Sequence, residues 1–129
     1  MDESRRTFLC AIASAAAALP LGQAVAQGFN LGQTWQVREY EPDGTYWDGT
    51  WTRRGNSSVF DAQWRYSVNG AVANDVIEFR GVSADGTVTL YRYQYTGYYY
   101  GHLSRDGTHV RRGTTTFYRP GSYWEAEIF

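Results

Sequence analysis

The chain has 129 residues, and its 12 basic side chains are nearly balanced by 13 acidic ones, which leaves a formal net charge of −1. This balance offers no excess of positive charge to neutralise phosphates, so we do not expect nucleic-acid binding. Cysteine occurs once, at Cys10, so the chain cannot form an internal disulfide. Length and composition therefore predict one small domain that is stabilised by side-chain packing.

The first residues have the three regions of a secretory signal peptide. Arg5 and Arg6 give a basic start, an apolar run extends from Phe8 to Leu21, and the small residues Ala24-Val25-Ala26 form a cleavage site. The run is shorter than the roughly 20 apolar residues that a membrane-spanning helix needs. We therefore expect residues 1–26 to be removed and residues 27–129 to form a single working domain without a membrane anchor.

Residues Ser4-Arg5-Arg6-Thr7-Phe8-Leu9 resemble the twin-arginine (Tat) export motif, with Cys10 in place of its usual lysine. The resemblance implies that the Tat export machinery is the partner of the precursor. It also implies that the domain is folded before export and works in the periplasm or outside a bacterial cell. An ordinary Sec signal that contains two arginines is the alternative.

The expected working domain is rich in aromatic residues. The chain has 5 Trp, 11 Tyr and 6 Phe, and all of them except Phe8 lie after residue 26. Each such side chain buries about 150–250 Å² when it is enclosed, so a small domain can build a core from few of them. Aromatic residues and threonine also favour strands, which indicates a β-type domain.

Short runs of alternating polar and apolar residues follow one another, and turns that contain glycine separate them. Asp-Gly and Asn-Gly pairs in these turns favour tight hairpins. The segment from Ser67 to Asn74 is the least regular connection. The predicted strands are Thr34–Tyr40, Tyr46–Arg53, Val59–Tyr66, Asp75–Val82, Thr87–Tyr95, Tyr98–Ser104, His109–Tyr118 and Tyr123–Ile128.

These runs predict an all-β fold, an eight-stranded antiparallel up-and-down meander. Closure into a small barrel removes the exposed edge strands that a flat sheet would leave, and a β-sandwich is the alternative. Four glycines fall within predicted strands, where they indicate sharp bends or room for a bulky neighbour. They are Gly49, Gly81, Gly101 and Gly113.

The strand order, the length, and Gly49-Thr50-Trp51 followed by Arg-Gly-Asn-Ser are similar to the small calycin-type barrels, which include lipocalins and avidins. The likeness covers the whole expected domain but concerns its architecture only. It implies a barrel and no particular ligand, since such folds serve many functions.

Catalytic and metal-binding patterns are weak. His102 and His109 flank one turn with Asp106, which is an incomplete metal site on an ordinary hairpin. No nucleophile motif is present, and we expect no cofactor. A carboxylate-based hydrolase stays the third hypothesis for function, with candidate residues Asp48, Asp61, Glu78, Glu125 and Glu127.

The most unusual feature is a tyrosine-rich hairpin. Alternation places Tyr91, Tyr93 and Tyr95 on one face of a strand, and Tyr98, Tyr99 and Tyr100 follow the next turn. Because only one face of a hairpin can enter the core, the other exposes rings that mark an interaction surface, or form cross-strand ladders that stiffen the hairpin.

The opposite face of that strand carries Val88, Leu90 and Arg92, so an inward Leu90 brings Arg92 inside or to the mouth of the barrel. A buried arginine needs a carboxylate or several other acceptors. Glu78 is a possible partner, unless Ile77 and Phe79 point inward instead and leave Glu78 outside.

We therefore predict an exported binding protein, not an enzyme, that uses an aromatic-lined cup or the tyrosine hairpin to bind a small ligand, a glycan or a protein. A periplasmic inhibitor or interaction module that acts through the Ser67–Asn74 loop is the alternative. The predicted binding residues are Trp47, Trp51, Trp64, Arg92, Tyr91, Tyr93, Tyr95, Tyr98 and Tyr100.

Overall fold

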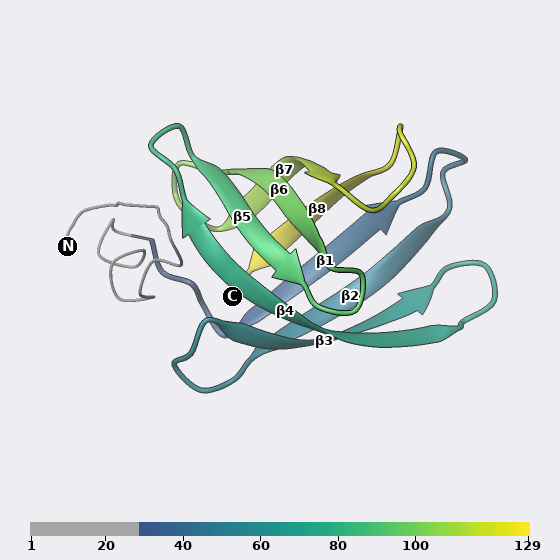
Figure 1. Cartoon of the computed structure of the whole chain (residues 1–129), viewed down its shortest axis with the longest axis horizontal. Helices are drawn as coiled ribbons and strands as arrows, with labels where there is room; N and C mark the ends of the chain where they lie inside the picture. The colour runs from purple at the N-terminus through teal and green to yellow at the C-terminus, as the bar shows by residue number, and fades with distance from the viewer. Residues whose placement is uncertain (1–28) are drawn as a thin grey trace.

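A computed structural model describes residues 29–129, so the predicted signal peptide lies outside the described residues. This part of the chain is all-β and contains eight antiparallel strands (Figure 1). They are β1 (Thr34–Tyr40), β2 (Tyr46–Arg53), β3 (Val59–Tyr66), β4 (Val72–Val82), β5 (Thr87–Arg92), β6 (Gly97–Leu103), β7 (His109–Thr115) and β8 (Tyr123–Ile128).

Each strand pairs with the next along the chain, and β8 returns to pair with β1. The sheet is thus a closed up-and-down barrel, which confirms the predicted fold class and its barrel form. No strand has a free edge within the described chain, as expected for a barrel. This architecture is compatible with the calycin-type barrels.

The predicted limits of β1, β2, β3 and β8 match the structure, whereas those of the other strands differ. β5 and β7 each end three residues earlier than predicted, and β4 begins three residues earlier, at Val72, because Val72 and Asn74 pair with Arg65 and Gln63 of β3. The irregular connection predicted for Ser67–Asn74 is therefore a short hairpin turn. Pairing with a long neighbouring strand has outweighed the turn preference of the local residues.

Tryptophan rings occupy the places where strand glycines leave room. A Cβ atom on Gly49 would lie 2.7 Å from the Trp64 ring, and one on Gly113 would lie 2.5 Å from the Trp124 ring. The Trp124 indole N–H reaches the carbonyls of Tyr100 and Thr114, both at 3.0 Å. The prediction that these glycines make room for bulky neighbours is confirmed at both sites.

The segment before β1 closes one end of the barrel. Phe29 and Leu31 are buried, and the Phe29 ring lies 5.6 Å from the ring of Phe79. The Trp35 indole donates a hydrogen bond to the Leu31 carbonyl at 2.9 Å. Because this end is closed by apolar side chains, polar groups inside the barrel lie toward the other end.

Candidate binding surface

Four buried tryptophans fill the middle of the barrel. The ring of Trp51 lies 5.8 Å from Trp35, 6.3 Å from Trp64 and 6.0 Å from Trp124. All four side chains are at most 1% exposed. Trp51 and Trp64, predicted to line a ligand cup, are thus part of the packed core.

Trp47, the third predicted cup tryptophan, lies at the polar end of the barrel. It is half-buried and its ring stacks on Tyr66 at 4.6 Å. The Tyr66 hydroxyl donates a hydrogen bond to the hydroxyl of Thr45 at 3.1 Å. This aromatic pair therefore forms part of the barrel rim.

Glu39 is a buried carboxylate just inside this rim. Its Oε2 accepts hydrogen bonds from the Trp64 indole at 2.7 Å and the Tyr99 hydroxyl at 2.6 Å, and its Oε1 accepts one from Tyr118 at 2.6 Å. Burial raises the pKa of Glu39, although these hydrogen bonds and the charge of Arg92 act against that rise. Burial and the nearby Glu39 charge also raise the pKa of Tyr99 and Tyr118.

Arg92 points into the barrel, as the alternation of β5 predicts, but its partner is Asp75. Arg92 Nε donates to Asp75 Oδ2 at 2.8 Å, and the two side chains are 4% and 1% exposed. Glu78 lies on the outside because its neighbours Ile77 and Phe79 point inward. The possible Arg92–Glu78 pair is therefore wrong, and the alternative in which Glu78 lies outside is correct.

Asp75 also holds the turn between β5 and β6. Its Oδ1 accepts a hydrogen bond from the Gln94 amide at 3.2 Å, and the Tyr93 amide donates to the Val76 carbonyl at 3.1 Å. The turn carries Tyr95 over the guanidinium of Arg92, which lies 4.0 Å from the ring centroid. The buried ion pair thus sets the position of the tyrosine hairpin.

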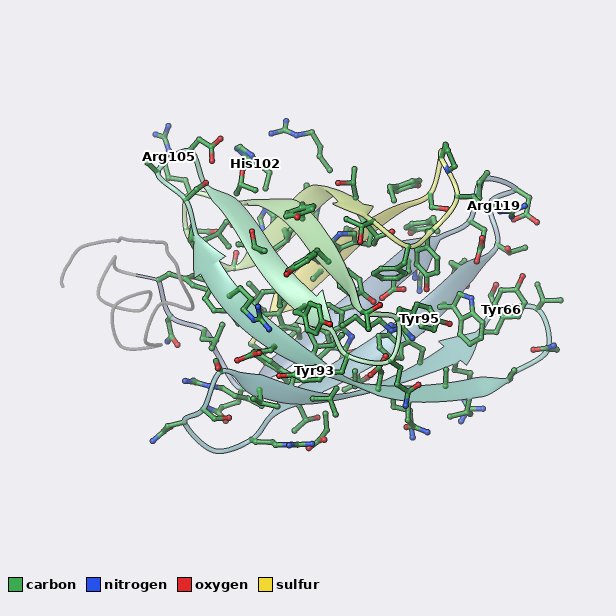
Figure 2. All side chains as sticks on the ribbon, in the orientation of Figure 1. Tyr66, Tyr93, Tyr95, His102, Arg105 and Arg119 are labelled. Carbon is green, nitrogen blue, oxygen red and sulfur yellow. The ribbon has the colours of Figure 1, made fainter. Side chains whose placement is uncertain are left out.

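Tyr95 consequently leaves the face on which it was predicted. β5 ends at Arg92, and Tyr95 belongs to the following turn, where its ring packs against Phe117 at 5.2 Å. Figure 2 shows Tyr93 and Tyr95 apart, with Tyr95 on the side of Tyr66. Tyr95 therefore covers the barrel end, while Tyr91 and Tyr93 stay on the outer surface.

Four rings from β5, its turn and β6 form a continuous outer surface, which we call the tyrosine face: Tyr91, Tyr93, Tyr98 and Tyr100. Tyr91 lies 5.1 Å from both Tyr93 and Tyr98, and Tyr98 stacks on Tyr100 at 6.0 Å. Tyr93 is 47% exposed and Tyr100 is 37% exposed. The structure therefore brings together four of the predicted binding residues in contact with solvent.

Polar groups border the tyrosine face. The Arg80 guanidinium lies 4.8 Å from the centre of the Tyr91 ring and pairs with Glu78 at 3.0 Å. The Tyr93 hydroxyl donates to Glu78 at 2.9 Å, and this hydrogen bond raises the pKa of Tyr93. The rings are thus held in place by polar neighbours.

The structure offers little for metal or carboxylate chemistry. No group of three His, Cys, Asp or Glu side chains within residues 29–129 could hold a metal ion. Each of the five carboxylates considered for hydrolysis lies on the outer surface in an ion pair with an arginine.

No helix in this part of the chain is long and apolar enough to cross a membrane.

The inward positions of the buried Glu39, Asp75 and Tyr99 and of the half-buried Tyr118 were not predicted. Glu39 shares the alternation of the apolar residues Trp35 and Val37 in β1, which is a signal for its inward position. Asp75 is predicted only as the first residue of a strand. Its partner Arg92 lies diagonally on the neighbouring strand β5, and alternation does not determine which residues on different strands meet.

Comparisons with protein-family models, with curated proteins and with solved structures give no match. Function must therefore be inferred from the residues of this chain.

Proposed function

We propose that this protein is an exported, non-catalytic binding protein that holds a neutral glycan on its tyrosine face. The observation that carries this proposal is the set of four neighbouring tyrosine rings on the outer surface, two of which are more than a third exposed. An exposed aromatic patch of this kind marks an interaction site.

The filled interior favours the outer surface over a ligand cup. A typical small-molecule site is a cavity of about 300–1,000 Å³ lined by apolar side chains. Here the tryptophans that could line such a cavity pack against one another, and the Glu39 and Arg92 side chains are enclosed by protein partners. The exposed rings on β5 and β6 have no such cover.

The chemistry of the tyrosine face suits a sugar better than a protein. Charged and hydroxyl groups lie directly beside its rings, so hydrogen-bonding partners are available next to each stacking surface. Thr89 and Thr114 lie opposite Tyr100 on the neighbouring strands, and Arg80 and Glu78 lie beside Tyr91. Tyrosine rings can stack on the C–H faces of a pyranose while the bordering groups bond its hydroxyls.

A neutral sugar fits the charge of this surface. Arg80 and Glu78 neutralise each other, so no net charge remains to select a phosphate or a sulfate. Pyranoses whose hydroxyls are all equatorial, such as β-linked glucose and N-acetylglucosamine, present flat C–H faces on both sides of the ring. They are therefore the preferred class.

The Tat-like leader supports export of the folded domain. A cysteine-free barrel from Gln27 onward needs no oxidant outside the cytoplasm, which agrees with that route. We propose the periplasm or the cell exterior as its place of action and the Tat machinery as the partner of the precursor.

The proposal is tested by titrating ¹⁵N-labelled protein, residues 27–129, with cellohexaose and with chitohexaose. We expect saturable amide shifts on β5 and β6, around Tyr98 and Tyr100. Saturable shifts confined to the barrel rim around Trp47 and Tyr66 would instead support a ligand at the mouth of the barrel. No saturable shift with either sugar would overturn the proposal.

A second candidate is the interaction module that acts through a loop. Its supporting observation is the β3–β4 hairpin, where Val68 is 63% exposed and Val72 is 47% exposed. Exposed apolar side chains on a protruding hairpin suit contact with a protein. Val68→Ser tests this candidate, because it should abolish capture of a protein partner from periplasmic extract and leave sugar binding unchanged.

A further inference from the structure

A second tyrosine ladder lies on the other side of the barrel. Tyr40 stacks on Tyr123 at 4.6 Å with an angle of 17° between the rings, and Tyr46 lies 5.8 Å from Tyr40. The guanidinium of Arg38 lies 4.1 Å from the centre of the Tyr46 ring. Tyr123 is 49% exposed, so one end of this ladder is open to solvent.

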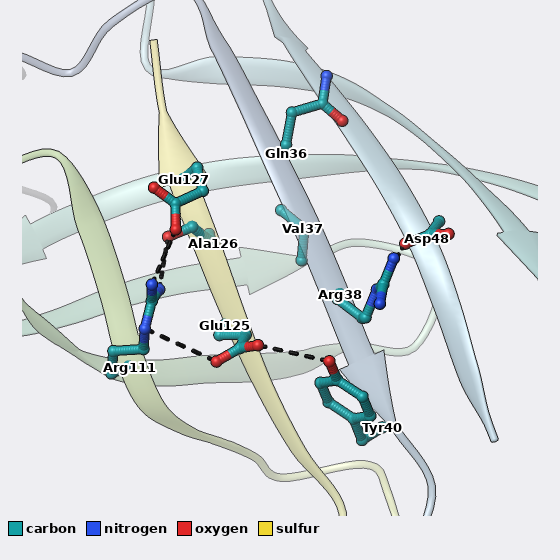
Figure 3. Close-up of a pocket in the computed structure, with 9 residues that line it drawn as sticks. All are labelled: Gln36, Val37, Arg38, Tyr40, Asp48, Arg111, Glu125, Ala126 and Glu127. Carbon is teal, nitrogen blue, oxygen red and sulfur yellow. Dashed lines mark hydrogen bonds and ion pairs between the residues drawn. The ribbon is translucent and has the colours of Figure 1, made fainter. Parts of the chain in front are cut away.

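A groove of about 270 Å³ adjoins the ladder on the outer surface of β7, β8, β1 and β2 (Figure 3). Tyr40 forms part of both the ladder and the groove. Arg38 with Asp48 and Arg111 with Glu127 form ion pairs in its lining, each at 2.8 Å. The groove therefore places polar and charged side chains beside one end of an aromatic ladder, a combination that suits a sugar.

Glu125 has only long contacts to its neighbours in this lining. Its Oε2 accepts from the Tyr40 hydroxyl at a long 3.4 Å, and its Oε1 lies 3.7 Å from Arg111 Nε. Figure 3 shows the carboxylate between these two side chains. The carboxylate can therefore accept hydrogen bonds from ligand hydroxyls without losing a strong protein partner.

The two surfaces lie on different parts of the barrel circumference. The tyrosine face lies on β5 and β6 and the turn between them, whereas the groove is lined from β7, β8, β1 and β2. Figure 1 shows β5 in front and β1 and β8 behind it. The centres of the two surfaces are therefore about three strands apart in the ring of eight, so a sugar ring seated on one does not occupy the other.

We propose that the groove beside Tyr40 and Tyr123 is a second sugar-binding site, so that one barrel holds two glycan segments and can cross-link them. The ligand class rests on the proposed function, whereas the site itself rests on the groove, the ladder and Glu125. Linking two weak sites on one molecule raises the strength of attachment to a polymer by about 10²–10⁴-fold without any new contact.

Calorimetric titration with the hexasaccharide that binds the tyrosine face tests this inference. We expect two sites per barrel. Glu125→Gln, which preserves the shape of the side chain, and Tyr123→Ala should each weaken one site about 3- to 10-fold, the effect of losing one stacking or hydrogen-bonding contact. Gln63→Ala, on the outer surface of β3 between the two surfaces, is the matched control and should leave both sites unchanged.

The two proposals fail in different ways. A stoichiometry of one sugar, together with unaltered binding by both Glu125→Gln and Tyr123→Ala, overturns the second site and leaves the tyrosine face in place. Loss of all sugar binding in a Tyr98→Ala, Tyr100→Ala double variant also overturns the second site and leaves the tyrosine face in place. Absence of binding by the unmodified protein overturns both proposals. Two sites, one of which persists in the double variant and weakens in Glu125→Gln, support both.

Discussion

Arg92 and Asp75 form an ion pair inside the barrel, with Arg92 Nε 2.8 Å from Asp75 Oδ2 and both side chains almost fully buried. The rings of Trp64 and Tyr95 lie 4.1 Å and 4.0 Å from the guanidinium carbon. Asp75 also accepts a hydrogen bond from the Gln94 amide. One carboxylate therefore links the buried ion pair to the turn between β5 and β6, which carries Tyr93.

Asp75→Asn should therefore destabilise the barrel strongly. It leaves Arg92 buried beside a neutral side chain, and breaking a buried pair costs about 3–5 kcal/mol. Asp48→Asn removes the partner of Arg38 in an exposed pair and should cost about 0–1 kcal/mol. Urea unfolding of both variants measures the difference in the free energy of unfolding. Equal decreases would show that the buried Arg92–Asp75 pair stabilises the barrel no more than an exposed pair does.

Stability should depend on the protonation of Glu39. Because its pKa in the folded state is raised above the ordinary value of 4.5, protonation favours the folded state. This contribution is fully present below the pKa of the unfolded chain and is lost as the pH rises through the folded-state pKa. It amounts to about 1.4 kcal/mol for each unit by which the pKa is raised.

Glu39→Gln removes this titration and keeps the shape of the side chain. The amide oxygen of the glutamine can accept hydrogen bonds from Trp64 and Tyr99, and its amide nitrogen can donate one to the Tyr118 hydroxyl. The free energy of unfolding of the variant, relative to the unmodified protein, should increase as the pH rises above 4.5 and level off above the folded-state pKa. Parallel curves across this range would contradict a raised pKa.

Trp64→Phe and Trp51→Phe form a matched pair of core variants. Both tryptophans are at most 1% exposed, so the loss of ring volume is similar. Trp64 donates to Glu39, whereas the indole N–H of Trp51 has no hydrogen-bond partner among the described residues. Trp64→Phe should therefore reduce the free energy of unfolding by about 1–3 kcal/mol more, because it removes one of the three hydrogen-bond donors to the buried Glu39 carboxylate. A larger decrease in the free energy of unfolding for Trp51→Phe than for Trp64→Phe would show that packing, and not the hydrogen bond to Glu39, determines the cost.

Alternation along the chain predicted the strands and the inward position of Arg92, because opposite faces of a strand meet core and solvent in turn. It did not predict the contact between Arg92 and Asp75. Arg92 pairs in register with Ile77, and Asp75 reaches it diagonally across two positions of β4. That contact depends on the stagger of strands in a closed barrel, which local sequence does not specify.

The tyrosine hairpin shows the same limit. The sequence indicates exposed rings at Tyr91, Tyr93, Tyr98 and Tyr100, and the structure places these four together. Tyr95 breaks the pattern because β5 ends three residues earlier, at Arg92. The turn that follows is held by the hydrogen bond from the Gln94 amide to Asp75. A buried side chain distant in sequence thus decides the end of the strand.

The most direct test of the central claim is the affinity of a Tyr98→Ala, Tyr100→Ala double variant for cellohexaose or chitohexaose, with the groove weakened by Glu125→Gln in every protein compared. Removing two stacking rings should weaken binding by about 5- to 150-fold, since each ring contributes about 0.5–1.5 kcal/mol. Tyr66→Ala, the same change at the barrel rim, should leave the affinity unaltered. Equal affinity of the double variant and its parent would contradict the account.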